Sequence, residues 1–335
     1  MPTAVPSRDI VARLGDEELQ ASVGSGLASV EQLLLESVKS EDPFIAETAR
    51  HLVEAGGKRF RPLLVLLAAQ FGDPTRSGVT ESAVVVELTH LATLYHDDVM
   101  DEAPVRRGID SANTRWGNTV AILTGDFLFA RASDILADLG PEAVRLQART
   151  FERLVSGQIR ETAGPRPGED PVEHHLQVLA DKTGSLIATS GRFGAMFADC
   201  TPAQIETLTR FGERIGVAFQ LADDLVDVLS DGDESGKTPG TDLREGVPTL
   251  PTLMALSSLD PADARLVELL SGPIPDDDDH AEALQLLRSH EAVERARVEA
   301  RRWADDARES LRALPDVPAR AALESLCDFV VTRTG

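Results

Sequence analysis

The chain has 335 residues, of which 42% are hydrophobic and only 4% aromatic, so it is long enough for one large domain or two average ones. Acidic residues outnumber basic ones by 56 to 33, giving a formal net charge of −23. Such a charge argues against nucleic acid and against an anionic membrane surface as binding partners.

The beginning of the chain predicts a leader followed by short helices. Residues 1–24 are largely polar and lack the apolar stretch of a signal peptide, so we expect a flexible leader ahead of a single domain over 25–335. Apolar spacing predicts one helix over 27–38 and another over 43–55, which ends at two glycines. The basic segment 58–62 then leads into a short apolar helix.

An apolar run from about residue 80 predicts a buried helix that ends in three aspartates, Asp97, Asp98 and Asp101. Asp97 and Asp101 lie four residues apart and share a helical face. Carboxylates that ionise together in a partly dry cleft repel each other and raise each other's pKa. A divalent cation removes this repulsion, and ligation by carboxylates alone suits Mg²⁺.

The same spacing returns at Asp223, Asp224 and Asp227, again at the end of an apolar helix. One such motif arises by chance, but two that each end a buried helix predict a group of Mg²⁺ ions holding a polyanion between the helices.

Helices are also predicted between and after the two motifs, over 118–139, 141–163, 171–197, from 202 to the second motif, and near 280–312 and 318–333. The Gly- and Pro-rich segment 230–251 is placed as an active-site lid would be. His174 and His175 are expected at the surface, and the four aspartates 276–279 in a turn that caps a helix. We find no convincing strand, so the predicted fold is an all-α, single-domain helical bundle.

The segment Gly56-Gly57-Lys58-Arg59-Phe60-Arg61-Pro62 places three cations on a turn before a helix. Two glycines let the backbone approach a ligand, and Lys58 and Arg61 are suited to hold phosphate oxygens. Taken alone, such a cluster is more often a solvated basic surface. Beside two acidic motifs it predicts a second anion site, and therefore two phosphorylated substrates.

With these motifs the chain closely resembles the trans-isoprenyl diphosphate synthases, or polyprenyl synthetases. The resemblance extends from about Leu27 to Arg333 and depends on the glycine-cation segment, both aspartate motifs and a set of shorter matches: Glu87-Leu88-Thr89-His90, Arg106-Arg107-Gly108, Lys182-Thr183, Phe219-Gln220, Gly236-Lys237 and Gly240-Thr241-Asp242-Leu243. It implies a usually homodimeric all-α fold around a deep central cavity. The implied reaction condenses isopentenyl diphosphate with an allylic diphosphate such as geranyl, farnesyl or geranylgeranyl diphosphate.

The resemblance also implies a role for each matched residue. The main Mg²⁺ ligands on the allylic diphosphate, with three ions when it is bound, would be Asp97, Asp101 and Asp223. Their supporting carboxylates would be Asp98, Asp224 and Asp227. The cations on the same diphosphate would be Arg106, Lys182 and Lys237. The residues that bind isopentenyl diphosphate would be Lys58, Arg61, His90 and Arg107. The oxygen dipoles facing the allylic cation would be those of Thr183 and Gln220.

Product length should depend on the residues at the floor of the cavity. Ala92 and Thr93 precede the first motif and are small where short-chain members of the family carry bulky aromatics, which predicts a medium- or long-chain all-trans product. Helical geometry alone favours Thr93 as the lining residue. Phe127 and Phe129 are placed to close the cavity lower down. Val247 stands where many members have Lys, which puts one contact to the lid or the diphosphate in doubt.

Three alternatives stay open. A shorter-chain geranylgeranyl or farnesyl diphosphate synthase fits the same motifs. A class I terpene cyclase would usually carry a different second motif and would not need the Lys58 and Arg61 site. A non-catalytic subunit of a heteromeric synthase would tend to lose aspartates, and all six are present. The two cysteines form no disulfide framework, and no apolar run is long enough for a membrane span, so we expect a cytoplasmic protein without stable membrane insertion.

Overall fold

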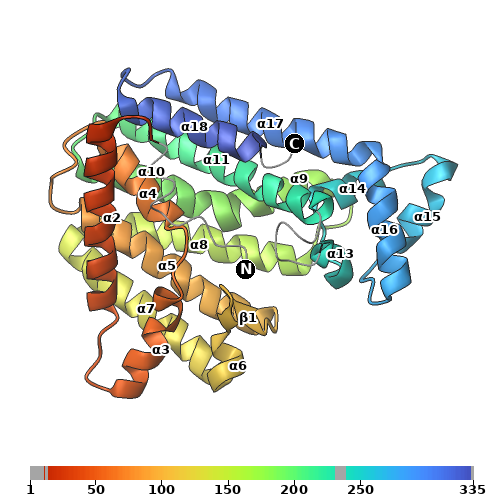
Figure 1. The fold of residues 1–335 in the computed structure, drawn as a ribbon, viewed down its shortest axis with the longest axis horizontal. Helices are drawn as coiled ribbons and strands as arrows, with labels where there is room; N and C mark the ends of the chain where they lie inside the picture. The colour runs from red at the N-terminus through yellow and green to blue at the C-terminus, as the bar shows by residue number, and fades with distance from the viewer. Residues whose placement is uncertain (1–10, 12–13, 231–238, 333–335) are drawn as a thin grey trace.

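The computed structural model describes residue 11 and residues 14–230 and 239–332. The predicted ligand Lys237 lies outside the described residues. Strands in the described part are limited to the short antiparallel pair β1 (Val105–Arg106) and β2 (Ile109–Asp110). The all-α fold predicted from the sequence is therefore confirmed (Figure 1).

The helices between residues 17 and 163 are α2 (Glu17–Ser37), α3 (Pro43–Glu54), α4 (Phe60–Ala69), α5 (Val79–Met100), α6 (Ala112–Trp116), α7 (Asn118–Leu139) and α8 (Pro141–Ala163). The helices that follow are α9 (Pro171–Leu179), the π-helix η1 (Ala180–Gly184), α10 (Ser185–Phe197), α11 (Pro202–Leu229), α13 (Thr241–Glu245), α14 (Leu250–Leu256), the 3₁₀ turn η2 (Pro261–Asp263), α15 (Ala264–Leu269), α16 (Asp277–Ser289), α17 (Glu291–Leu311) and α18 (Pro318–Thr332).

The leader predicted over residues 1–24 is wrong for its last part, because α2 begins at Glu17. The Asp16 side chain accepts a hydrogen bond from the backbone nitrogen of Leu19 at 2.8 Å, which satisfies one free amide of the first turn. Leu19 and Val23 are buried. These two apolar residues, four apart, therefore extend the buried face of α2 about two turns before the predicted start.

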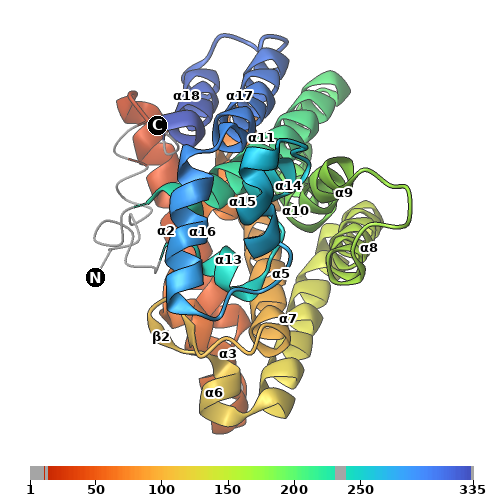
Figure 2. The ribbon, with the colours of Figure 1, turned by 90° about the vertical axis from the view of Figure 1, so that its right-hand side faces the viewer.

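Two long helices, α5 and α11, run through the middle of the bundle. Helix α5 packs against α2, α4, α7 and α10, while α11 packs against α10, α17 and α18. Figures 1 and 2 show α17 and α18 lying along α11, with α7 and α8 on the other side of the molecule. The apolar core has two clusters, and α11 contributes to both, through Ile215 to one and Val217 to the other.

Several element boundaries follow local signals. Gly140, with φ of 102°, ends α7, and Pro141 begins α8, as the sequence predicts. The side chain of Asp276 accepts hydrogen bonds from two backbone amides of α16, which confirms the capping turn. The segment 230–251 is expected to be a loop, but its described part from residue 239 carries the short helix α13 and the first residues of α14. No described helix combines the length and the apolar character that crossing a bilayer requires.

Candidate active site

A cavity of about 510 Å³ lies between α4, α5, α8, η1, α10 and α11. Most of the site residues predicted from the sequence line it: Lys58, Arg61, His90, Thr93, Asp97, Arg106, Arg107, Lys182, Thr183, Gln220 and Asp223. His90 and Asp97 line the same cavity because seven residues are close to two turns of a helix.

The three carboxylates of the first motif have different surroundings. Asp97 lines the cavity, whereas the Asp98 side chain is fully buried. Arg106 Nε donates to Asp98 Oδ1 at 2.5 Å, and the other oxygen, Oδ2, is buried with no hydrogen-bond partner among the described residues. Asp98 therefore holds the side chain of Arg106, and Arg106 lines the cavity. Asp101 is exposed at the end of α5.

Burial and the nearby Asp101 raise the pKa of Asp97 to about 6, although Lys182 opposes the shift. This raised pKa lies above that of an unfolded aspartate, so the contribution of Asp97 to stability is present at low pH and is lost as the pH rises through about 6. A carboxylate held in this way fits a divalent cation, which would favour its ionised form.

The metal-free Asp97→Asn variant should therefore be more stable than the wild type above pH 6, because Asn carries no charge to desolvate. We expect its Tm to exceed that of the wild type by about 2 °C or more at pH 7.5, and the difference to vanish below about pH 4. Thermal scans in EDTA across this range measure it. A pH-independent difference would show that ionisation of Asp97 is not the cause.

The three carboxylates of the second motif also have different surroundings. Asp223 lines the cavity from α11. Asp224 is buried, and its Oδ2 lies 3.2 Å from Nε2 of His175 on α9. Asp227 accepts hydrogen bonds from the backbone nitrogens of Thr241 and Asp242, both at 3.2 Å, so it anchors the first turn of α13.

The surface position predicted for His174 and His175 is wrong. His175 is buried against Asp224, and the His174 side chain is 11% exposed and lies against Glu169 and the carbonyl of Arg160. The local sequence gives no signal for this, because Asp224, the partner of His175, lies 49 positions away.

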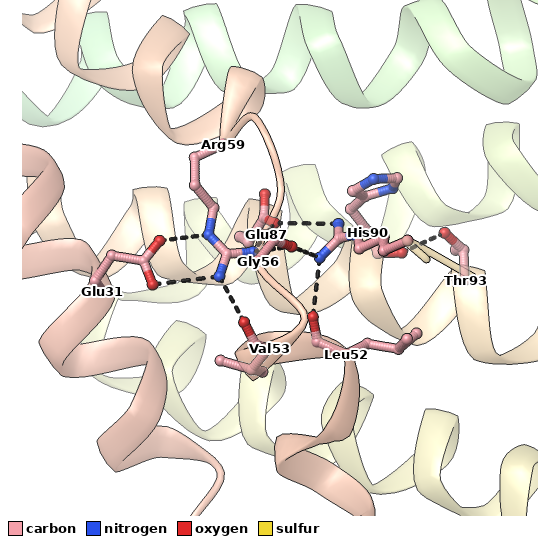
Figure 3. A network of polar contacts seen from close by, with 9 residues as sticks. Glu31, Leu52, Val53, Gly56, Arg59, Glu87, His90 and Thr93 are labelled. Atoms are coloured by element: carbon pink, nitrogen blue, oxygen red, sulfur yellow. Dashed lines mark hydrogen bonds and ion pairs between the residues drawn. The ribbon is translucent and has the colours of Figure 1, made fainter. Parts of the chain in front are cut away.

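The glycine-cation segment lines the same cavity, and Figure 3 shows the polar contacts around its residues Gly56 and Arg59. Arg59 has a left-handed backbone with φ of 47° and a side chain that points away from solvent. It donates to Glu31 through Nε at 2.5 Å, to Glu87 through Nη1 at 2.9 Å and to the carbonyl of Val53 at 2.9 Å. This buried arginine, which sequence reasoning assigned no role, anchors the segment.

Arg107 meets the same segment from the other side. Its Nη1 donates to the carbonyls of Leu52, at 2.9 Å, and Gly56, and its Nη2 lies 3.8 Å from Glu87. A Cβ atom on Gly57 would lie 3.0 Å from the guanidinium carbon of Arg107. The second glycine is thus needed for the close approach of Arg107.

Positive charge exceeds negative charge around this segment. Arg61 Nε is buried with no hydrogen-bond partner in the described part of the chain, and burial lowers the pKa of Arg61 to about 10. Burial and the neighbouring arginines 61 and 107 hold the pKa of His90 well below its usual value. His90 is therefore neutral and offers one donor and one acceptor. Such a cluster is complementary to a bound polyanion.

The remaining walls come from η1, α8, α10 and α11. Lys182 on η1 pairs with Glu161 at 2.5 Å between Nζ and Oε2. Thr183 and Gln220 line the cavity beside it, and the rings of Phe60 and Phe219 stack with centroids 5.7 Å apart.

Part of the cavity wall is largely apolar. Its lining here consists of Thr93, Leu94, Leu154, Leu186 and Ile187. Ala92 is fully buried and does not line the cavity, which agrees with the helical geometry that favoured Thr93. Phe127 and Phe129 pack against the core outside this lining.

No group of three or more His, Cys, Asp or Glu side chains within the described ranges is arranged to hold a metal ion by itself. Asp97 and Asp223 face the cavity from different helices, so a ligand with several anionic oxygens is needed to complete a shared site. A cavity in an all-α protein that joins carboxylates, cations and an apolar wall is typical of enzymes that act on diphosphates with hydrocarbon chains.

Comparison with known proteins gives the particular family. The family model described as Polyprenyl synthetase matches residues 42–287, and the chain belongs to this family. It is 52% identical to the nonaprenyl diphosphate synthase of Mycobacterium tuberculosis, over 96% of each chain. It is 37% identical to heptaprenyl diphosphate synthase component 2 of Geobacillus stearothermophilus, over 92% of this chain and 95% of that one.

Similarity to solved structures supports the same family. The geranylgeranyl pyrophosphate synthase of Corynebacterium glutamicum, complexed with calcium and isoprenyl diphosphate, superposes with a TM-score of 0.87 at 47% identity. The match covers 96% of this chain and 99% of that one.

Proposed function

We propose that the protein is a polyprenyl diphosphate synthase that condenses isopentenyl diphosphate with an allylic diphosphate. The observation that supports the proposal is that one cavity is lined both by the carboxylates Asp97 and Asp223 and by the cations Lys58, Arg61 and Arg107. We assign the allylic diphosphate to the carboxylates and isopentenyl diphosphate to the cations.

The residues act in a defined order. Arg106 and Lys182 hold the allylic diphosphate while its C–O bond breaks and the bonding electrons leave with the diphosphate. Thr183 and Gln220 present oxygen dipoles to the allylic cation, and the apolar wall excludes water from it. Arg61 and Arg107 place isopentenyl diphosphate so that its double bond forms the new C–C bond. The released diphosphate takes the proton that is then lost, so no catalytic Ser, Cys or His is needed.

The carboxylates fit a divalent metal ion, for which we propose Mg²⁺. The raised pKa of Asp97 and the approach of two motifs to one cavity support this. Relatives from Corynebacterium glutamicum and Caulobacter crescentus were solved with calcium and isoprenyl diphosphate. When bound, three such ions would neutralise the leaving diphosphate, held chiefly by Asp97, Asp101 and Asp223.

Incubation of the purified protein with Mg²⁺, isopentenyl diphosphate and each allylic primer tests the proposal. Chromatographic sizing of the products should show chains that grow by five carbons at each step. A cyclic hydrocarbon would instead indicate a terpene cyclase. Activity that appears only when a partner protein is added would indicate a heteromeric synthase.

For the product we propose a medium- or long-chain all-trans polyprenyl diphosphate. The relative with 52% identity is named for a nonaprenyl product, and the cavity wall carries Thr93 in place of an aromatic residue. A geranylgeranyl product is the second candidate, because the Corynebacterium glutamicum protein at 47% identity is named for it.

The Thr93→Phe variant should make a product shorter by at least one isoprene unit, since a ring at this wall removes space from the growing chain. Thr93→Val keeps the volume and serves as the control. Product sizing by mass spectrometry measures the change. The same product from both variants would remove Thr93 from the set that limits chain length.

We further propose a homodimer formed through α7 and α8. Large apolar residues are exposed on these adjacent helices, namely Ile122, Leu123, Val144, Val155 and Ile159. Those on α8 share one face because their spacings of eleven and four residues return to nearly the same angle. The name of the Geobacillus stearothermophilus relative as component 2 makes a hetero-oligomer the alternative outcome of a light-scattering measurement.

The cytoplasm is the compartment we propose. Cys200 and Cys327 are both free and buried, and burial raises their thiol pKa values to about 11 and about 12. Such unreactive thiols are typical of proteins from reducing compartments.

A further inference from the structure

A buried carboxylate stands directly beside the catalytic pair Lys182 and Thr183 without entering the cavity. Asp181 is 6% exposed and does not line the cavity. It accepts hydrogen bonds from Arg153 Nε at 3.0 Å, Arg160 Nη1 at 2.7 Å and Gln177 Nε2 at 3.0 Å. The two carboxylate oxygens are therefore shared among three donors from α8 and α9.

Asp181 lies within the π-helix η1, which interrupts the otherwise α-helical run from α9 to α10. Single π-turns inside α-helices are rare and are frequently found at functional sites. Here its consequence is visible in the directions of neighbouring side chains. Lys182 and Thr183 face the cavity, while Asp181 faces the arginines of α8.

The turn is packed closely against α8. A Cβ atom on Gly157 would lie 2.7 Å from the backbone nitrogen of Lys182 and 3.1 Å from the carbonyl carbon of Asp181. Gly157 thus permits the contact but offers no side chain that would hold the turn in place. Instead, the ion pairs of Asp181 with Arg153 and Arg160, which lie on the same helix α8, hold the turn in place.

We propose that Asp181 is a positioning residue that keeps η1 in the π-turn and thereby aims Lys182 and Thr183 at the allylic diphosphate. The assignment of that diphosphate to this part of the cavity rests on the proposed function. Because Asp181 touches neither substrate site, its loss affects one substrate only, through the two residues that follow it.

The test compares the wild type with Asp181→Asn. Asn fills the same space but presents an NH₂ group to one of the three donors, which breaks the arrangement. We expect kcat to fall about tenfold and KM for the allylic diphosphate to rise about tenfold, because small displacements of catalytic groups are costly. KM for isopentenyl diphosphate should change less than about twofold, since that site lies on other helices.

Two further variants separate positioning from folding. Arg160→Gln removes one donor at a side chain that is 51% exposed, so it should fold normally and show the same pattern at about threefold. Glu213→Gln is the matched control, because Glu213 accepts a 2.6 Å hydrogen bond from Arg153 but forms no hydrogen bond with the Asp181 carboxylate in the described part of the chain. It should leave both KM values unchanged.

Calorimetric titration with an unreactive thiolo analogue of the allylic diphosphate in Mg²⁺ gives a second readout that needs no turnover. Its Kd should rise about tenfold in Asp181→Asn. Equal changes in both KM values, or an unchanged Kd in a folded variant, would overturn the positioning role. Failure of the wild type to form elongated products would instead refute the proposed function and leave the titration result standing.

Discussion

The Asp97→Ala and Asp223→Ala variants should lose turnover by about 10³-fold or more while keeping the helical circular dichroism of the wild type. Both carboxylates line the cavity from different helices, α5 and α11. With either one removed, a diphosphate bound through metal ions would be held from one of the two helices only. The loss should appear in kcat, because the interaction strengthens as the C–O bond breaks.

A matched control keeps the same chemical change outside the cavity. Asp126 on α7 is 61% exposed and lies 3.5 Å from His96, the neighbour of Asp97. Asp126→Ala should retain turnover within about twofold. Isothermal titration with Mg²⁺ and an allylic diphosphate should show weakened binding for the two active-site variants and unchanged binding for Asp126→Ala. Retained turnover in Asp97→Ala would refute its assignment as a metal ligand.

The sequence was sufficient for features that depend on local spacing. The limits of α7 and α8 follow from Gly140 and Pro141, and the common cavity of His90 and Asp97 follows from the helical repeat. These predictions need no knowledge of which helices are neighbours. For the same reason the all-α class was accessible from composition and periodicity.

Features that depend on distant partners were not accessible. Arg59 and Arg61 both line the cavity, yet the Arg59 side chain bonds Glu31, Glu87 and a backbone carbonyl, whereas Arg61 Nε has no hydrogen-bond partner in the described part of the chain. The left-handed φ of 47° at Arg59 and its partner Glu31, on α2, decide between them. Neither can be deduced from the order of residues in the segment.

The aspartate motifs show the same limit. Their spacing alone does not separate the six carboxylates, whereas in the structure Asp98, Asp224 and Asp227 contact Arg106, His175 and the backbone of α13. A carboxylate that supports a ligand and one that binds metal look alike in sequence. The residues they contact lie 8, 49 and 14 positions away, respectively, and only the fold brings them together.

The second large effect is expected at Glu87. This side chain is 2% exposed and forms ion pairs with Arg59, at 2.9 Å, and Arg107, at 3.8 Å. It also opposes the lowering of the Arg61 pKa by burial. Glu87→Ala should reduce the free energy of unfolding by about 3–5 kcal/mol, because it leaves buried guanidinium groups without their carboxylate. Urea denaturation measures the loss.

Glu31→Ala is the control for this change, since Glu31 bonds the same guanidinium twice but has a side chain that is 42% exposed. Water replaces a partner at such a position, so the cost should stay at about 1 kcal/mol or less. Equal destabilisation by the two variants would mean that Arg59, not Glu87, determines the stability of the cluster.

Glu87→Ala also predicts a response to anions. With its carboxylate gone, the cluster of Arg59, Arg61 and Arg107 has gained net positive charge, and inorganic pyrophosphate can supply the missing anion in the adjoining cavity. Ligand that binds only the folded state raises Tm. The rise produced by pyrophosphate without metal should therefore be larger for Glu87→Ala than for the wild type. A smaller rise in Tm for Glu87→Ala would contradict this. It would show that Glu87 is needed to keep the diphosphate site in shape, and that this effect exceeds the repulsion between its charge and the ligand.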